Sequence, residues 1–349
     1  MTKVRFDQIA KEVRNTFSGD KAGVPIVGLE HIIPNELLLS DHDIDTENTF
    51  TKAFKKGQIL FGRRRAYQQK AAVATFDGIC SGDITVIEPI DGAVCPELLP
   101  FIIQNERFFE HAVRGSAGSL SPRVKWEHLS SYEIELPSYE EQVKLANTLW
   151  AAYNLKTSYK TLLTSIDEMV KSQFIEMFGQ SSLDNGIIGD YLLLKAGKAM
   201  PADRISSSKA DGMFPCFGGN GIRGYVDSYN YDGDYAIIGR QGALCGNVCL
   251  AQGKFYATEH AVVVTPKAIV DSTWLFFALN QMNLNQYARG VAQPGLAVNE
   301  LEKLPFSVPD ISKQIEFSII AKQADKSKFE LKKSIEAIDK VIKSLINNI

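Results

Sequence analysis

Two helix-length stretches of the chain carry the same spacing of apolar side chains, and one constant offset, which takes Pro137 to Pro309, relates them. We call it the helix offset. In the first stretch, the apolar residues follow the alternating three- and four-residue steps of a heptad: Leu145, Leu149, Ala152, Tyr159, Leu163, Ile166, Val170 and Met177. The equivalent positions of the second stretch hold Phe317, Ala321, Ala324, Leu331, Ile335, Ile338, Ile342 and Ile349, and Leu345 adds a further apolar residue to this seam. The pattern predicts two long helices that pack against each other antiparallel.

The ends of both helices carry recognisable capping residues. Ser138 and Glu141 have the spacing of a capping box, and Gly179 follows the last seam position of the first helix. Asp310 is a good N-cap for the second helix. Lys156 and its equivalent Lys328 fall on the apolar seam, where a long polar side chain sets the register of the pairing at some cost in stability.

The segments before the two helices have mixed α/β character with many glycines, and they also match each other. When Gly62 is aligned with Gly239, Arg63 pairs with Arg240 and the strand-like run 84–87 pairs with 261–264. The sequence therefore predicts an α/β fold, in which two similar mixed modules are separated by two long antiparallel helices in a pseudo-two-fold arrangement. The expected parts are residues 1–137, 138–180, 181–309 and 310–349.

Composition places the chain among water-soluble proteins of a reducing compartment. Its 349 residues include 45% hydrophobic ones, without an apolar run long enough to span a bilayer. We expect no signal peptide, no membrane contact and a cytoplasmic location. Five cysteines, an odd number without framework spacing, predict free thiols. Cys245 and Cys249, with Cys216 and His260 in the same segment, have donors for zinc, but buried packing is the commoner role of such cysteines. We therefore expect no metal.

Charge is distributed unevenly along a chain whose net charge is only −3. Between Glu47 and Asp77 there is no acidic residue, and seven basic ones fall there. Arginine forks fit guanine O6 and N7, and side-chain amides fit adenine N6 and N7. The candidates for DNA contact in this run are Arg63, Arg64, Arg65, Gln68, Gln69 and Lys70. A solvated basic loop is the plain alternative, and the lack of nearby acids argues against an ion-pair role.

Further candidates lie outside this run. Arg114, Arg123 and Lys125 are expected to contact phosphates, which positions a protein on DNA without specifying sequence. In the second segment Arg223, Arg240, Gln241 and Asn247 sit among glycines, which allow close backbone approach to a groove but are equally common in turns. Arg289 and Gln293 are added by analogy with Arg114, because Arg289-Gly290 repeats Arg114-Gly115.

Several of these runs occur in order and twice, and together they resemble a known family. The first half carries GVPIVG at 23–28, GQILFGR at 57–63 and LPSYEEQ at 136–142. The second half carries FPCFGGNGIRGYV at 214–226, IIGRQG at 237–242 and GNV at 246–248. Over essentially its whole length, the chain resembles the specificity subunit (HsdS) family of Type I restriction-modification systems. One departure is that residues 309–314 lack the paired acids of Glu140 and Glu141.

The resemblance implies a non-catalytic reader of double-stranded DNA. In this family each module reads one half of a bipartite site, and two modification subunits bind the helices to form an adenine methyltransferase, which restriction subunits can join. By this resemblance we expect partner contacts from Gln142, Lys171, Gln314 and Lys343. No catalytic residue and no cofactor is expected on this chain; S-adenosylmethionine, ATP and Mg²⁺ would be bound by the partners.

Other classes of protein fit the sequence less well. An adenine methyltransferase needs an Asn-Pro-Pro or Asp-Pro-Pro turn, and neither tripeptide occurs. Gly57 and Gly62 are followed by arginines rather than by the Lys-Ser or Lys-Thr of a phosphate-binding loop. A reader that works with a fused nuclease-methyltransferase subunit remains an alternative. A coiled-coil scaffold that does not bind DNA is another, although a scaffold has no need of two divergent modules with exposed arginines.

Overall fold

The computed structural model describes residues 2–179, 186–290 and 294–347. The chain divides into two compact units, which we call the first module (residues 1–161 and 332–349) and the second module (residues 162–331). The long helices α4 (Tyr139–Phe178) and α8 (Ile311–Asn347) each contribute to both modules. Grouping by contacts therefore differs from the four consecutive parts expected along the sequence, because each module contains one end of each helix.

The first module contains short strands and three short helices besides its portions of α4 and α8. The helices are α1 (Leu99–Ile103), α2 (Glu106–Arg114) and α3 (Trp126–Leu129). A five-stranded sheet has the order β2 (Ala10–Val13), β9 (Ile84–Pro89), β6 (Ile59–Gly62), β7 (Ala71–Ala74) and β4 (Leu38–Leu39). A second sheet has the order β3 (Ile26–Val27), β8 (Gly78–Cys80) and β5 (Lys52–Phe54). Two further pairs are β1 (Thr2–Arg5) with β12 (Glu133–Leu136) and β10 (Ser116–Ala117) with β11 (Arg123–Val124).

Alternation along the central strands of this module separates two cores. Ile59 and Phe61 of β6 join the core that the helices cover, whereas Leu60 between them joins the core on the other face of the sheet. Successive side chains of a strand point to opposite faces, so a strand buried on both sides needs apolar residues at every position. Strand β6 fits this requirement, because all four of its residues are buried.

The second module repeats this architecture. One sheet has the order β13 (Leu192–Ala196), β20 (Ala261–Pro266), β17 (Tyr235–Gly239) and β18 (Val248–Ala251). The other has the order β15 (Gly221–Val226), β14 (Phe214–Gly218), β19 (Lys254–Ala257) and β16 (Tyr231–Asp232). The short helices are α5 (Ile188–Tyr191), α6 (Ser272–Gln281) and α7 (Val298–Leu301).

The strand registers confirm the internal repeat. In the first module Gly62 of β6 is paired with Ile84 of β9, and in the second Gly239 of β17 is paired with Ala261 of β20. The step from Ile84 to Ala261 equals the step from Gly62 to Gly239, so one alignment of the sequence accounts for both partners. The mixed α/β class and the duplication of the modules are therefore confirmed at the level of individual residue pairs.

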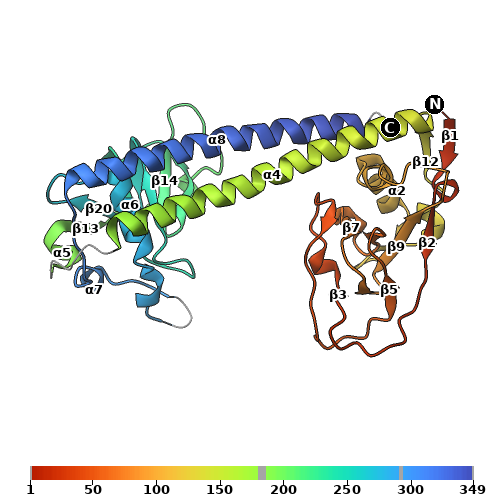
Figure 1. Cartoon of the computed structure of the whole chain (residues 1–349). Coiled ribbons are helices and arrows are strands. Elements are labelled where there is room, and N and C mark those ends of the chain that lie inside the picture. The colour runs from red at the N-terminus through yellow and green to blue at the C-terminus, as the bar shows by residue number, and fades with distance from the viewer. Residues whose placement is uncertain (1, 180–185, 291–293, 348–349) are drawn as a thin grey trace. The chain divides into compact units, whose positions relative to one another are not determined.

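The long helices run side by side and antiparallel within each module (Figure 1). In the first module Lys156 Nζ of α4 lies 2.6 Å from Asp339 Oδ1 of α8. In the second module Lys328 Nζ of α8 lies 2.9 Å from Asp167 Oδ1 of α4. The helix offset converts one ion pair into the other, so each seam lysine contacts an aspartate of the opposite helix.

The predicted capping box at the start of α4 is also present. Ser138 N donates to Glu141 Oε2 at 3.0 Å, and Glu141 N donates to Ser138 Oγ at 3.4 Å. The two residues thus satisfy each other's backbone N–H groups, which the first turn of a helix leaves without partners.

A large apolar side chain near the C-terminal end of each long helix is buried in a module. Phe174 of α4 is buried in the second module, with its ring 5.1 Å from that of Phe317 on α8. Its equivalent Ile346 of α8 is buried in the first module, where its carbonyl oxygen accepts a hydrogen bond from Asn105 Nδ2 at 2.9 Å. The heptad seam predicted from the sequence omits both residues, because they pack against the module rather than against the other helix alone.

Among the residues that the structure describes, none of the helices is both apolar and long enough to span a lipid bilayer.

Candidate nucleic-acid interface

The basic run after β6 forms a tight loop on the first module. Arg63, Arg64 and Arg65 are half-buried, and a short 3₁₀ helix, Ala66–Gln68, follows them. Arg65 and Gln69, on either side of this helix, have φ angles of 55° and 53°, in the left-handed region that non-glycine residues seldom adopt. The Nε atoms of all three arginines are buried without a hydrogen-bond partner. These side chains therefore belong to a defined loop rather than to a freely solvated basic segment.

Backbone hydrogen bonds hold this loop against two other segments. Arg63 N donates to Asp83 O at 2.9 Å, and Val124 N donates to Arg63 O at 2.9 Å. Arg65 N donates to Pro122 O at 2.8 Å. We call these three bonds the loop frame, and residues 116–124, which contain β10 and β11, the hairpin. The frame brings Arg123 of the hairpin next to the loop, as the isolated β-bridge between Arg64 and Arg123 shows.

Asp83 joins two of the predicted arginines by its side chain. Its Oδ1 accepts from Arg123 Nε at 2.6 Å, and its Oδ2 accepts from Arg64 Nη1 at 3.3 Å. The hydrogen bond from Arg123 is the main reason why the pKa of Asp83 is lowered. The expectation that no acid pairs with this loop was therefore wrong. Asp83 lies beyond the acid-free run in the sequence, and the turn between β8 and β9 carries it back to the arginines.

The second module repeats the loop frame with other residues. Arg240 N donates to His260 O at 3.0 Å, and Leu296 N donates to Arg240 O at 2.9 Å. Gly242 N donates to Pro294 O at 3.0 Å. These bonds correspond one by one to those of the first module, and they make Arg240 the equivalent of Arg63. The predicted correspondence of these two arginines is thus confirmed, and their buried Nε atoms share the lack of a hydrogen-bond partner.

Side chains on the two frames differ although the backbone bonds agree. Arg64 is replaced by Gln241, Arg65 by Gly242 and Arg123 by Gly295, as the β-bridge between Gln241 and Gly295 shows. His260 stands where the first module has Asp83, and its Nε2 lies 3.1 Å from Glu259 Oε1. The two frames therefore present different hydrogen-bonding groups from the same backbone arrangement.

The positive-φ positions of the two loops also coincide. Gly242 and Gly246 have φ angles of 93° and 88°, and they occupy the positions of Arg65 and Gln69. Tyr67 in the first loop and Leu244 in the second are equivalent, and each is 57% exposed. The first loop thus keeps side chains at two positions where the second has none.

The remaining candidates in the first module are scattered. Gln68 ends the 3₁₀ helix of the loop, and Lys125 is exposed just after the hairpin. Lys70 Nζ donates to Leu29 O at 2.6 Å, so its charge is directed toward the module rather than away from it. Arg114 is exposed, and its Nη2 lies 3.7 Å from Glu110 Oε2.

In the second module Arg289 is close to the frame, because it exchanges two backbone hydrogen bonds with Gly295. Its Nη2 lies 3.3 Å from Glu300 Oε2. Asn247 Nδ2 donates to Asn220 Oδ1 at 3.0 Å, and Arg223 is exposed on β15. Gln293 lies outside the described residues.

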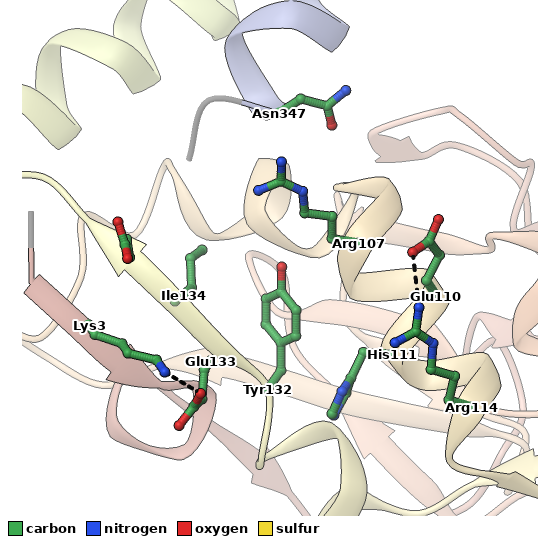
Figure 2. A pocket seen from close by; sticks show the side chains of 10 residues that line it. Lys3, Arg107, Glu110, His111, Arg114, Tyr132, Glu133, Ile134 and Asn347 are labelled. Atoms are coloured by element: carbon green, nitrogen blue, oxygen red, sulfur yellow. Dashed lines mark ion pairs between the residues drawn. The ribbon is translucent and has the colours of Figure 1, made fainter.

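Figure 2 shows a cavity of about 650 Å³ on the first module that includes none of the loop arginines. Its lining carries charges of both signs: Lys3 is directed toward Glu133 and Arg114 toward Glu110 (Figure 2). The acidic side chains neutralise the basic ones, so the cavity lacks the positive potential that favours a polyanion.

Two of the predicted partner-contact residues serve the modules instead. Gln142 Oε1 accepts from Cys95 N at 2.9 Å, and Gln142 Nε2 donates to Pro137 O at 3.0 Å. Gln314 accepts from Asp271 N and donates to Pro309 O in the same way, at 2.8 and 2.7 Å. Both side chains are buried, so the assignment of these glutamines to a partner interface was wrong. They satisfy backbone groups at the point where each helix leaves its module.

Lys343 and Lys171 lie in equivalent surface cavities of the two modules. The first, about 410 Å³, is lined by Lys343 and by the pair Lys156 and Asp339. The second, about 760 Å³, is lined by Lys171 and by the pair Lys328 and Asp167. Burial, which alone would lower the pKa of Lys328, is outweighed by hydrogen bonds to Asp167 and Asp325, and the pKa is raised. Each module thus presents a cavity with the same arrangement of charged helix positions.

The described residues include no group of three or more His, Cys, Asp or Glu side chains arranged to hold a metal ion. Burial raises the pKa of the Cys249 thiol to about 11. Cys216 and Cys245 are buried. The cysteines of this segment therefore pack as small apolar side chains.

Comparison with protein families gives one match, in two stretches. Residues 10–168 and 185–339 match the family described as Type I restriction modification DNA specificity domain. The two stretches together cover most of the chain and follow the duplication of the modules.

Curated relatives carry related names. Over 162 residues the chain is 46% identical to the Type I restriction enzyme EcoprrI specificity subunit of Escherichia coli. The matched stretch makes up 46% of this chain and 39% of that protein. Over 114 residues it is 30% identical to a putative type I restriction enzyme specificity subunit of Haemophilus influenzae. This stretch makes up 32% of this chain and 30% of that protein. The matched part thus spans well under half of either relative.

Solved structures share the fold. The S subunit of the Type I restriction-modification system from M. genitalium superposes with a TM-score of 0.64 at 15% identity, over 99% of this chain and 95% of that one. A chain from work on complex assembly and conformational transition of the type I R-M system superposes with a TM-score of 0.61 at 14% identity, over 99% and 96%.

Proposed function

Because the chain belongs to the Type I restriction modification DNA specificity family, we propose that it is the DNA-reading subunit of a restriction-modification complex. Each module reads one half of a bipartite site in double-stranded DNA, and an unread gap separates the halves. The chain directs adenine methylation, and restriction where the system is complete, but carries no catalytic residue. S-adenosylmethionine, ATP and Mg²⁺ are bound by the partner subunits.

One observation carries this proposal: the same backbone frame presents different side chains in the two modules. Arginine forks and amides are the groups that read base edges, and Arg64 in one frame is replaced by Gln241 in the other. A pair of readers with a common scaffold and different hydrogen-bonding groups suits a site whose two halves differ in sequence. A scaffold protein would gain nothing from this divergence.

The partners are two modification subunits, one for each module. The equivalent cavities beside Lys343 and Lys171 support this number, because each offers the same helix positions to a partner. Exposed apolar residues on α8 of the second module, Ile315 at 47% and Ile319 at 65%, add surface that a protein partner can cover. Restriction subunits join this complex in a complete system.

The test is single-molecule sequencing of adenine methylation in host DNA with the gene present and deleted. Loss of one gapped adenine motif on deletion establishes both the class and the target. An unchanged set of motifs, with the partner methyltransferase expressed, contradicts DNA reading and favours the scaffold.

A further inference from the structure

The hairpin presents a leucine side chain to solvent beside the loop arginines. Leu120 is 90% exposed and is the middle residue of the loop 118–122 that joins β10 and β11. We propose that Leu120 enters a groove of the DNA and contacts the bases of the half-site that the first module reads. This inference rests on the proposed DNA-reading function and adds a contact to it that the basic residues alone do not provide.

The position of Leu120 relative to the arginines is fixed by contacts on its C-terminal side. Ser121 Oγ accepts a hydrogen bond from Arg64 Nη2 at 3.0 Å, and Pro122 O accepts one from Arg65 N at 2.8 Å. Arg123 is held by Asp83. Three successive residues after Leu120 are thus bound to the arginine loop or to its acid. A DNA that reaches the loop arginines therefore also reaches the leucine.

The shape of the hairpin end suits a groove. Leu120 is the one large side chain among neighbours that are small: Ser116, Ala117, Gly118, Ser119 and Ser121. Gly118 has a φ of 117°, which allows the tight reversal of the chain without a side chain at that point. A narrow loop with a single apolar end can pass between the phosphate backbones, as the apolar side chains of many groove-binding proteins do.

Charge decides which partner covers this leucine. An isolated exposed leucine is common and needs no partner. Here Arg64 and Arg123 flank it, and their only nearby acid among the described contacts, Asp83, balances one of the two charges. The remaining positive charge favours a polyanion over an apolar protein surface. Leucine can then make an apolar contact with the methyl group of thymine.

The second module offers a natural comparison. The frame makes Pro294 the equivalent of Pro122, which is the helix offset again, so Ala292 is the sequence equivalent of Leu120. Ala292 lies outside the described residues. Because alanine lacks the three outer carbons of leucine, the proposal assigns the apolar contact to the first module alone. Leu120→Ala gives the first hairpin the residue that the second module has at this position.

The test measures DNA binding by the full chain in complex with its modification subunits. The duplexes carry the native site or a site with either half scrambled. Leu120→Ala should weaken binding to the native duplex by up to about fiftyfold, because three buried carbons are lost. It should not weaken binding further when the first half-site is already scrambled. Leu120→Met should restore most of the affinity, and Ile269→Ala, at a site 86% exposed on the second module, should change nothing.

The outcomes separate this inference from the function on which it rests. If Leu120→Ala binds the native duplex as tightly as the wild type, the leucine contact is refuted while DNA reading stands. If the loss is equal on native and scrambled duplexes, Leu120 contacts no bases of the site, and the inference is likewise refuted. If the wild-type complex does not distinguish native from scrambled duplexes, both the inference and the proposed function fail.

Discussion

Replacing Arg65 by glycine separates the proposed DNA-reading role of this residue from any structural role. Arg65 has φ 55° and ψ 53°, a left-handed conformation that costs a non-glycine residue about 1–2 kcal/mol. Glycine removes this cost but gains conformational freedom in the unfolded chain, which costs about 0.5–1 kcal/mol. The backbone hydrogen bond from Arg65 N to Pro122 O is kept. We therefore expect Arg65→Gly to change the free energy of unfolding by about 0 to +1.5 kcal/mol.

Adenine methylation, unlike the free energy of unfolding, should change strongly in the Arg65→Gly variant. In the proposed function the guanidinium reads a base, and glycine has none, so adenine methylation should relax or disappear at the half-site assigned to the first module. Unfolding in urea can be followed by tryptophan fluorescence, because Trp126 and Trp150 lie in the first module and Trp274 in the second. Methylation is measured by single-molecule sequencing of the host DNA.

A matched control comes from the second module. Gly242 is the equivalent of Arg65, has a φ of 93°, and has open space where a Cβ would lie. Gly242→Ala should therefore lower the free energy of unfolding by about 1–2 kcal/mol through backbone strain alone. If Arg65→Gly instead destabilises the first module by more than about 1 kcal/mol, the side chain is structural. If it leaves the first half-site unchanged, Arg65 does not read DNA.

Three further predictions concern the contacts around the frame and the helices. Gln142→Ala should lower the free energy of unfolding by about 2–4 kcal/mol in urea, since two buried backbone groups lose their partner; Gln314→Ala should match it. Asp339→Ala should cost about 1–3 kcal/mol because it leaves the buried Lys156 charge unpaired, whereas Lys156→Met should stay within about 1 kcal/mol in the same assay. The pKa of Asp83 is lowered, so the stabilisation by its carboxylate is present above its unfolded pKa of about 4 and is lost as the pH falls further. Proteolysis of the loop should therefore increase as the pH falls, and an Asp83→Asn variant should lack this increase.

The repeat was predictable because the sequence repeats both in the long helices and in the strands of the modules. The helix offset gave the helices and their seam, and the alignment of Gly62 with Gly239 gave the strand register. Phe174 escaped the heptad analysis because its burial depends on the second module, which the periodicity of a single helix does not report. Local pattern thus determines which elements form, whereas their outer contacts depend on residues remote in the chain.

The site was predictable only in part. The cluster of arginines was evident, but Asp83 was not, because it follows a different strand and joins the loop through the fold. The two glutamines were misassigned for a related reason. Repetition of Gln142 as Gln314 shows that the position matters in both halves, yet a repeated internal hydrogen bond and a repeated partner contact leave the same trace in a sequence.

The way the frame is built explains how a DNA reader of the proposed kind can change its target. Its three bonds in each module join backbone N–H groups to backbone carbonyls, and such bonds do not depend on which side chains the residues carry. Arg64 can therefore become Gln241, and Asp83 can become His260, without loss of the bonds that place the loop. The exceptions are the left-handed positions of Arg65 and Gln69, where glycine is the unstrained choice and where the second module has Gly242 and Gly246. Two non-glycine residues held there against their backbone preference support the proposal that these side chains serve a contact outside the loop.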